Sequence, residues 1–239
     1  MGRRIKEDFE NLLNFFDTYN LSEILKNTEF RELLSFVHKR YYSFLVLTIE
    51  LQDLVENPTG VHNISQKQYY YILETCSDVG QVLFLIANGC YKGAKLLLRS
   101  SIENFIKGVC LDSDPKISST KSVYEVFDLA KESETFSGSK SEIFKIIHNI
   151  YAELCKDVHT ADLEHMEHIT ALNTFPNYDI ESAKVIKNHL MKLLPAYITL
   201  LCLKYNSFYH GLYYTNKEIV QENLMTFFKK EVNNLNSEE

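Results

Sequence analysis

Turn-forming residues are scarce in this sequence. Its 239 residues include only 8 glycines and 4 prolines, whereas β-sandwiches and barrels need turn residues at short, regular intervals. No stretch alternates polar and apolar residues over a length that requires a strand. The scarcity therefore predicts an all-α protein built from long helices.

Cysteine pairs with the spacing of a metal or redox motif are absent. No two of the five cysteines lie two or three residues apart, which excludes a zinc knuckle and a CxxC pair. Each lies in an apolar, helix-like context, so we expect buried, reduced thiols and a reducing compartment. The five are Cys76, Cys90, Cys110, Cys155 and Cys202.

Long hydrophobic runs are absent too. The longest apolar runs, 82–87 and 193–203, are too short to span a bilayer, and the opening MGRRIKEDFENLL has no apolar signal core. These absences predict a cytoplasmic protein with no membrane association. The net charge of −7 opposes a broad phosphate-binding surface but permits a local basic stripe.

Helical periodicity accounts for nearly every apolar run. The pattern predicts one domain over residues 1–239, a bundle of about six to eight helices with its core at about 28–210 and a frayed tail at about 234–239. Thr28 is expected as an N-cap, and Pro195 should kink its helix. The expected helical ranges are about 4–18, 21–27, 28–56, 65–88, 91–111, 120–132, 141–159, 180–210 and 216–233.

Three histidines gather in CKDVHTADLEHMEH, residues 155–168. On a continuous helix His165 and His168 could share a face with Asp162, but His159 would lie about 180° from His168. Zinc needs three or four convergent ligands, and this stretch does not supply them alone. We therefore expect a helix boundary near His159 and no bound metal. The sequence also lacks the P-loop and dinucleotide glycine motifs, so no cofactor is expected.

One polar pair lies inside an otherwise apolar helix, in LLLRSSIENFIKGVC. Arg99 and Glu103 are one turn apart, and Arg99 is the only arginine after Arg40. One interpretation is an ion pair at a helix crossing. The other is functional: Lys92, Lys95 and Arg99 project from about the same side and could bind a phosphate group.

The expected helix at 141–159 carries residues that could complete a site. If His159 lies against Glu103 and Arg99, the carboxylate would raise the pKa of the histidine and make it a candidate acid or base. The alternative is a histidine at the core edge, bonded to a carbonyl or carboxylate. Cys155 and His159, one turn apart, also permit a nucleophilic pair. The residues on this edge of the helix are His148, Tyr151, Cys155 and His159.

LLLRSSIEN, followed about fifty residues later by IYAELCKDVHTAD, resembles a pattern in uncharacterised bacterial helical proteins: LLR-S-x-x-E, then Y-x-x-L-x-x-x-V-H. Those proteins are similar in layout to HEPN domains, helical bundles of toxins and phage-defence systems. The resemblance covers about residues 65–205. It implies a polar cluster of Arg99, Glu103, Tyr151 and His159. It also implies a homo-oligomer, a homodimer in the simplest case, that works with RNA or with another protein of the same system.

The motif of ribonuclease-active HEPN domains is not found where the resemblance would place it. That motif has an arginine, then roughly four to six residues, then a histidine, but LCKDV before His159 contains no arginine. Arg31 and His38 have a similar spacing, far toward the N-terminus. Three functions stay open: an RNA-directed HEPN-like protein of a defence or toxin system, a non-catalytic interaction or dimerisation module, and a hydrolase with a His-carboxylate site. Whether Arg99 and His159 face a cleft or a closed core separates them.

Overall fold

The computed structural model describes residues 2–17, 21–57, 63–159 and 176–234. Within these ranges the chain is helical and has no strand, so the all-α prediction is confirmed there. The α-helices outnumber the six to eight that were expected. They are α1 (Arg3–Asp17), α2 (Ser22–Lys26), α3 (Thr28–Glu50), α4 (Gln52–Glu56), α5 (Gln66–Ala87), α6 (Tyr91–Cys110), α7 (Val123–Glu132), α8 (Ser141–His159), α9 (Ile180–Lys204), α10 (Asn206–Gly211), α11 (Tyr214–Gln221) and α12 (Lys229–Asn233).

The additional helices arise where expected long helices are interrupted. The range 28–56 is divided at Leu51 into α3 and α4, and the range 216–233 is divided into α11 and α12 by a 3₁₀ turn. The range 180–210 is divided at Tyr205 into α9, which continues through Pro195 and ends at Lys204, and α10. Within the described ranges, every helix is too short or too polar to cross a bilayer.

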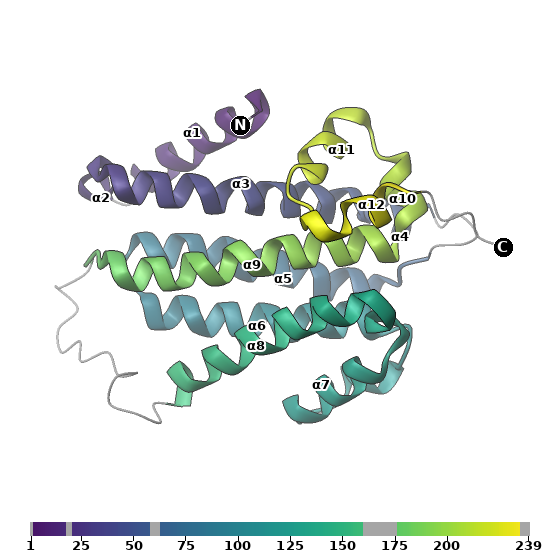
Figure 1. Ribbon diagram of the computed structural model, residues 1–239. Helices are drawn as coiled ribbons and strands as arrows, with labels where there is room; N and C mark the ends of the chain where they lie inside the picture. Colours follow the sequence, from purple (N-terminus) through teal and green to yellow (C-terminus); the bar gives the residue numbers. More distant parts are fainter. Residues whose placement is uncertain (1, 18–20, 58–62, 160–175, 235–239) are drawn as a thin grey trace.

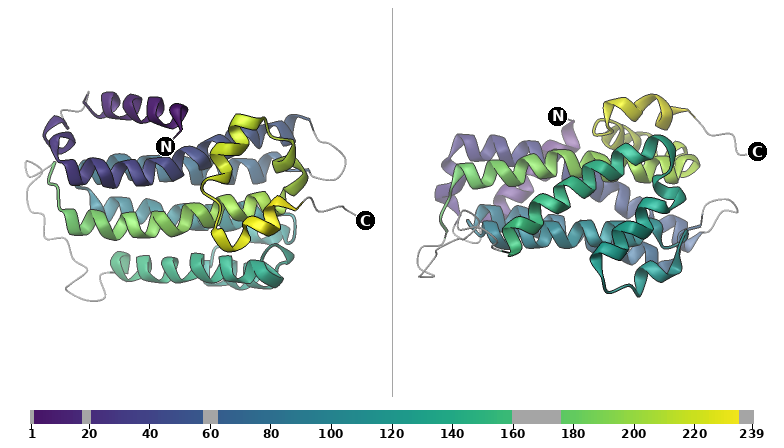
Figure 2. Two further views of the ribbon diagram at one scale, coloured as in Figure 1. Left: turned by 45° about the horizontal axis from the view of Figure 1, so that its top comes forward. Right: turned by 60° about the horizontal axis from the view of Figure 1, so that its bottom comes forward.

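The long helices lie side by side, with shorter ones on the outside (Figure 1). The hairpin of α5 and α6 packs against α3 and α9, and α8 crosses α6 and α9. α1 lies outside α3, whereas α7 lies on the opposite outer side beside α6 and α8 (Figure 2). The buried apolar side chains form one connected core that extends from α1 to α12. This arrangement leaves α7 as the outer wall over the polar face of α6.

The corner between α5 and α6 depends on one glycine. Gly89 has φ 72°, a left-handed conformation that glycine adopts without a steric penalty. The Cys90 amide donates to Leu85 O at 2.9 Å, and the Asn88 side chain donates to Phe84 O at 2.8 Å. These bonds end α5 and return the chain antiparallel to it, so the Asn-Gly corner expected from the sequence is present.

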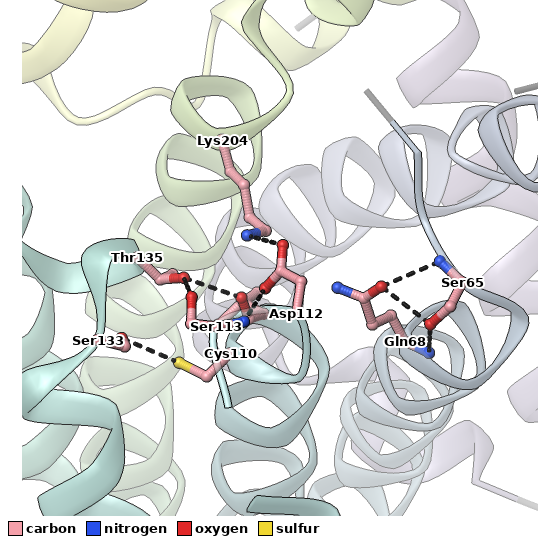
Figure 3. A network of polar contacts seen from close by, with 9 residues as sticks. Ser65, Gln68, Cys110, Asp112, Ser113, Ser133, Thr135 and Lys204 are labelled. Atoms are coloured by element: carbon pink, nitrogen blue, oxygen red, sulfur yellow. Dashed lines mark hydrogen bonds and ion pairs between the residues drawn. The ribbon is translucent and has the colours of Figure 1, made fainter. Parts of the chain in front are cut away.

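Side-chain caps fix where two of the long helices begin. Asn27 caps α3, because its side chain accepts a hydrogen bond from the Phe30 amide at 3.0 Å. The prediction that Thr28 is the N-cap is therefore wrong by one residue. Ser65 and Gln68 form a reciprocal capping box at the start of α5 (Figure 3). Each cap satisfies amide groups that a helix start leaves without an intrahelical acceptor.

None of the five cysteines, all of which lie in described residues, is in a disulfide. Cys76, Cys110 and Cys202 are buried, whereas Cys90 and Cys155 are half-buried. Burial raises the pKa of Cys76 to about 12 and that of Cys110 to about 11. These two thiols therefore stay protonated and unreactive at neutral pH.

Candidate functional site

Three of the four residues in the predicted polar cluster meet across α6 and α8. Arg99 Nε donates to Tyr151 Oη at 3.0 Å, and Tyr151 Oη donates to Glu103 Oε1 at 2.9 Å. Arg99 Nε also lies 3.3 Å from Glu103 Oε1. The guanidinium carbon is 5.3 Å from the centre of the Tyr151 ring. The one-turn spacing on α6 and the crossing of α8 therefore produce a closed triangle of polar contacts.

The triangle is only partly shielded from solvent. The side chains of Arg99 and Glu103 are 22% and 26% exposed, and Tyr151 is 8% exposed. Burial raises the pKa of Tyr151, and Glu103 adds to this effect while Arg99 opposes it. The phenol is therefore neutral at physiological pH and acts as a hydrogen-bond donor. Burial lowers the pKa of Arg99, but Tyr151 and Glu103 outweigh it, so the guanidinium keeps its charge.

Arg99 lines a cavity of about 540 Å³ between α6, α7 and α8, which we call the arginine cavity. Its volume falls within the range of small-ligand sites. Aromatic rings form much of its wall. The centre of the Phe127 ring lies 4.6 Å from the centre of the Tyr151 ring and 5.2 Å from the centre of the His148 ring. Its lining residues are Arg99, Ser122, Val123, Tyr124, Phe127, His148, Tyr151, Ala152 and Cys155. Arg99 thus faces a cavity, not a closed core.

Most hydrogen-bond donors of Arg99 are unused within the part of the chain that the structure describes. Its contacts there with Tyr151 and Glu103 all use Nε. A guanidinium has five N–H donors, four of them on the two terminal amino groups. These four donors make no hydrogen bond with a described residue.

The remaining histidine of the predicted cluster lies at the edge of what the structure describes. The described part of α8 reaches His159, but the side chain of His159 and the helix boundary predicted after it lie outside the described residues. Asp162, His165 and His168 also lie outside them. The described residues contain no group of three His, Cys, Asp or Glu side chains that could hold a metal ion. The proposed pairing of Cys155 with His159 stays a prediction.

The basic stripe expected from the sequence is not assembled at the arginine cavity. Lys95 Nζ lies 3.1 Å from Asp157 Oδ2, and both side chains are less than one-fifth exposed. Neither Lys92 nor Lys95 lines the arginine cavity. Because Asp157 neutralises Lys95, a phosphate bound by all three cations would have to compete with that carboxylate.

A second cavity, of about 320 Å³, adjoins the first at the start of α7. We call it the lysine cavity; its lining residues are Glu103, Lys107, Ser118, Ser119, Thr120, Lys121, Val123 and Val126. The sequence analysis did not select Lys107, although it follows Glu103 by four residues and so shares the face of Arg99 and Glu103. Nor did it select Tyr124 or Phe127. No local pattern identified those two, because only the position of α7 brings them to the site.

The other sequence candidate, Arg31 with His38, forms no comparable site. His38 is 1% exposed, and its Nε2 lies 2.8 Å from Asp8 Oδ2 on α1. The His38 ring also packs against Phe9, with ring centres 5.3 Å apart, whereas Arg31 is exposed. A ribonuclease histidine must reach its substrate, so this geometry favours a role for His38 in holding α1 against α3.

His38 should make the stability of the protein fall with decreasing pH. Burial lowers the pKa of His38, and Asp8 only partly opposes this. An unfolded histidine titrates near pH 6.5, so protons favour the unfolded chain as pH falls from about 6.5 toward the lower folded pKa. Each such histidine removes at most about 1.4 kcal/mol per pH unit. Burial lowers the pKa of His189 in the same way, despite Glu153 nearby.

The test is urea unfolding between about pH 7.5 and pH 5.5 for the wild type, His38→Gln and His189→Gln. Each variant should be less stable at neutral pH but should lose less stability on acidification than the wild type does. Equal losses in all three proteins would show that these histidines do not titrate on unfolding.

Comparison of the chain with protein-family models, with curated proteins and with solved structures finds no match. The HEPN resemblance therefore stays a prediction from the sequence motifs quoted above. The chemistry of the site combines a cation, aromatic rings and an adjoining pair of lysines.

Proposed function

We propose that the protein is an HEPN-like helical protein of a bacterial defence or toxin-type system, and that it binds single-stranded RNA at the arginine cavity. The observation that carries this proposal is the position of Arg99, which lines a cavity with aromatic walls and whose terminal amino groups make no hydrogen bond with a described residue. A purely structural pair would be expected to close against the core. The open cavity therefore favours a ligand-directed role over the alternative of a non-catalytic interaction or dimerisation module.

The chemistry of the cavity suits an unstacked nucleotide. Single-stranded RNA is bound by stacking its bases on aromatic side chains and by hydrogen bonds to base edges and phosphates. Tyr124, Phe127 and Tyr151 supply the rings, and Arg99 supplies charged donors. The net charge of −7 opposes broad electrostatic attraction to RNA, so recognition would be confined to this local site.

The geometry supports binding more strongly than catalysis. The raised pKa of Tyr151 keeps its proton on the phenol, which suits a donor that orients Glu103 and not a general base. The alternative of a hydrolase would require His148 or Cys155, which also line the cavity, to act on the ligand. We therefore assign Arg99 and Tyr151 to ligand binding.

Replacing Arg99 with glutamine should weaken RNA binding by about 10- to 100-fold, the usual effect of losing hydrogen bonds from a charged donor. The measurement is fluorescence anisotropy with a labelled single-stranded RNA about five nucleotides long. Arg3→Gln is the matched control, because Arg3 also pairs with a glutamate one turn away, at 2.8 Å from Glu7, but is 92% exposed on α1. Equal affinities of the wild type and Arg99→Gln would contradict the proposed function.

A further inference from the structure

Two cavities with different chemistry adjoin each other at the start of α7. The arginine cavity has aromatic walls, whereas the lysine cavity is lined by two lysines and three hydroxyl-bearing residues. Val123 lines both cavities. The Arg99–Glu103 pair lies between them, since Arg99 lines the first cavity and Glu103 lines the second. A ligand with two chemically different parts could therefore occupy both cavities at once.

We infer that the lysine cavity is a phosphate subsite for a ribonucleotide whose base occupies the arginine cavity. This inference rests on the proposed function and names the ligand class: a nucleoside carrying a phosphate, whether a free nucleotide or one unit of single-stranded RNA. The larger cavity, of about 540 Å³, accommodates the base and sugar, and the smaller, of about 320 Å³, accommodates the phosphate.

The charges around the lysine cavity favour an anion. Lys107 and Lys121 line the cavity and form no ion pair with the residues that the structure describes. A third lysine, Lys67, donates from Nζ to Ser118 Oγ in the cavity wall at 2.8 Å. Glu103 is the one acid among the lining residues, and its Oε1 is already bonded to Tyr151 and Arg99. The cavity is therefore locally positive on an acidic protein.

The orientation of α7 adds to this attraction. The helix begins at Val123, in the wall of the lysine cavity, and its N-terminal amides carry partial positive charge. Ser122 caps the helix by accepting from the Glu125 amide at 3.4 Å, which leaves the earlier amides of the first turn without an intrahelical acceptor. Glu125 lies in this turn but lines neither cavity.

The decisive variant is Lys107→Gln with Lys121→Gln, and its matched control is Lys229→Gln with Lys230→Gln. Each pair changes the net charge equally and contains one half-buried and one exposed lysine, but the control pair lies on α12. Affinities for adenosine, for adenosine monophosphate and for the labelled RNA are measured at several salt concentrations. The wild type and the control should bind the monophosphate about tenfold more tightly than adenosine, because charged donors contact the phosphate.

In the Lys107/Lys121 variant the preference for the monophosphate should disappear, while adenosine should bind as it does to the wild type. For single-stranded RNA, the dependence of log affinity on log salt concentration should also fall by about 0.7 for each phosphate that the variant no longer neutralises. An unchanged preference and an unchanged salt dependence would overturn the phosphate subsite.

The same measurements separate failure of this inference from failure of the proposed function. If Arg99→Gln weakens binding while the Lys107/Lys121 variant binds every ligand normally, only the phosphate subsite is wrong. If Arg99→Gln changes the affinity for none of the ligands, the proposed function fails and the phosphate subsite fails with it. If the monophosphate binds through the lysines but the RNA does not bind, the phosphate subsite is supported, and the phosphate that it binds is that of a free nucleotide.

Discussion

Replacing Arg99 with methionine and Glu103 with leucine together should leave the melting temperature unchanged or higher and should abolish RNA binding. Removing one member of a buried ion pair costs about 3–5 kcal/mol, whereas replacing both with apolar residues can be nearly neutral. The cost of each single replacement should be smaller here, because both side chains are about one-quarter exposed to solvent. Tyr151, which borders the cavity, can then form hydrogen bonds with water.

Melting curves of the wild type, the two single variants and the double variant form a complete cycle. We expect both single variants to melt below the double variant, and we expect only Glu103→Leu among the three to retain measurable RNA binding. A double variant that melts normally and binds RNA normally would remove the Arg99–Glu103 pair from any account of function.

Replacing Gly89 with alanine should be among the most destabilising single changes in the chain. Gly89 has φ 72°, and a Cβ atom there would overlap the backbone of Asn177. A non-glycine residue in this conformation costs about 1–3 kcal/mol in strain alone. Displacing the Asn177 backbone adds to that cost and would disturb the hydrogen bond from the nearby Asp179 amide to Tyr91 Oη, at 2.7 Å. For a domain of this size, each kcal/mol lowers the melting temperature by about 2–4 °C.

Two other glycines separate the contributions of strain and overlap. Gly138 also has positive φ, 59°, but a Cβ there would meet no described atom within 4 Å, so Gly138→Ala measures the strain alone. Gly211 is in open space without positive φ and should tolerate alanine. The expected order of destabilisation is Gly89, then Gly138, then Gly211. Equal losses at Gly89 and Gly138 would show that overlap with Asn177 contributes nothing.

The sequence predicted the long helices well because their apolar periodicity reflects burial in the core. The central pair, at 65–88 and 91–111, matches α5 and α6 within one or two residues, and Ser65 and the Asn-Gly corner gave local signals for its ends. The interruption at Leu51 and the division of 216–233 were not predicted. Apolar periodicity continues through both breaks, and the packing of neighbouring helices decides where the chain turns.

The same limit applies to the site. Arg99 and Glu103 could be paired in advance because they are one turn apart, and the resemblance of the two motifs to a helical family added Tyr151, which contacts both of them. The pairing of Lys95 with Asp157 and the lysine cavity could not be predicted. Both depend on the relative placement of separate helices, and the loop before α7 gives no sequence signal for where α7 will lie.

The most direct test of the account is photochemical cross-linking of RNA containing 4-thiouridine to the wild-type protein, followed by mass spectrometry of the modified peptides. The account predicts cross-links to the rings in the wall of the arginine cavity, at Tyr124, Phe127 or Tyr151, and their loss in Arg99→Gln but not in Arg3→Gln. Cross-links confined to α10–α12, none of whose residues lines the arginine cavity, would contradict the assignment of that cavity as the RNA site.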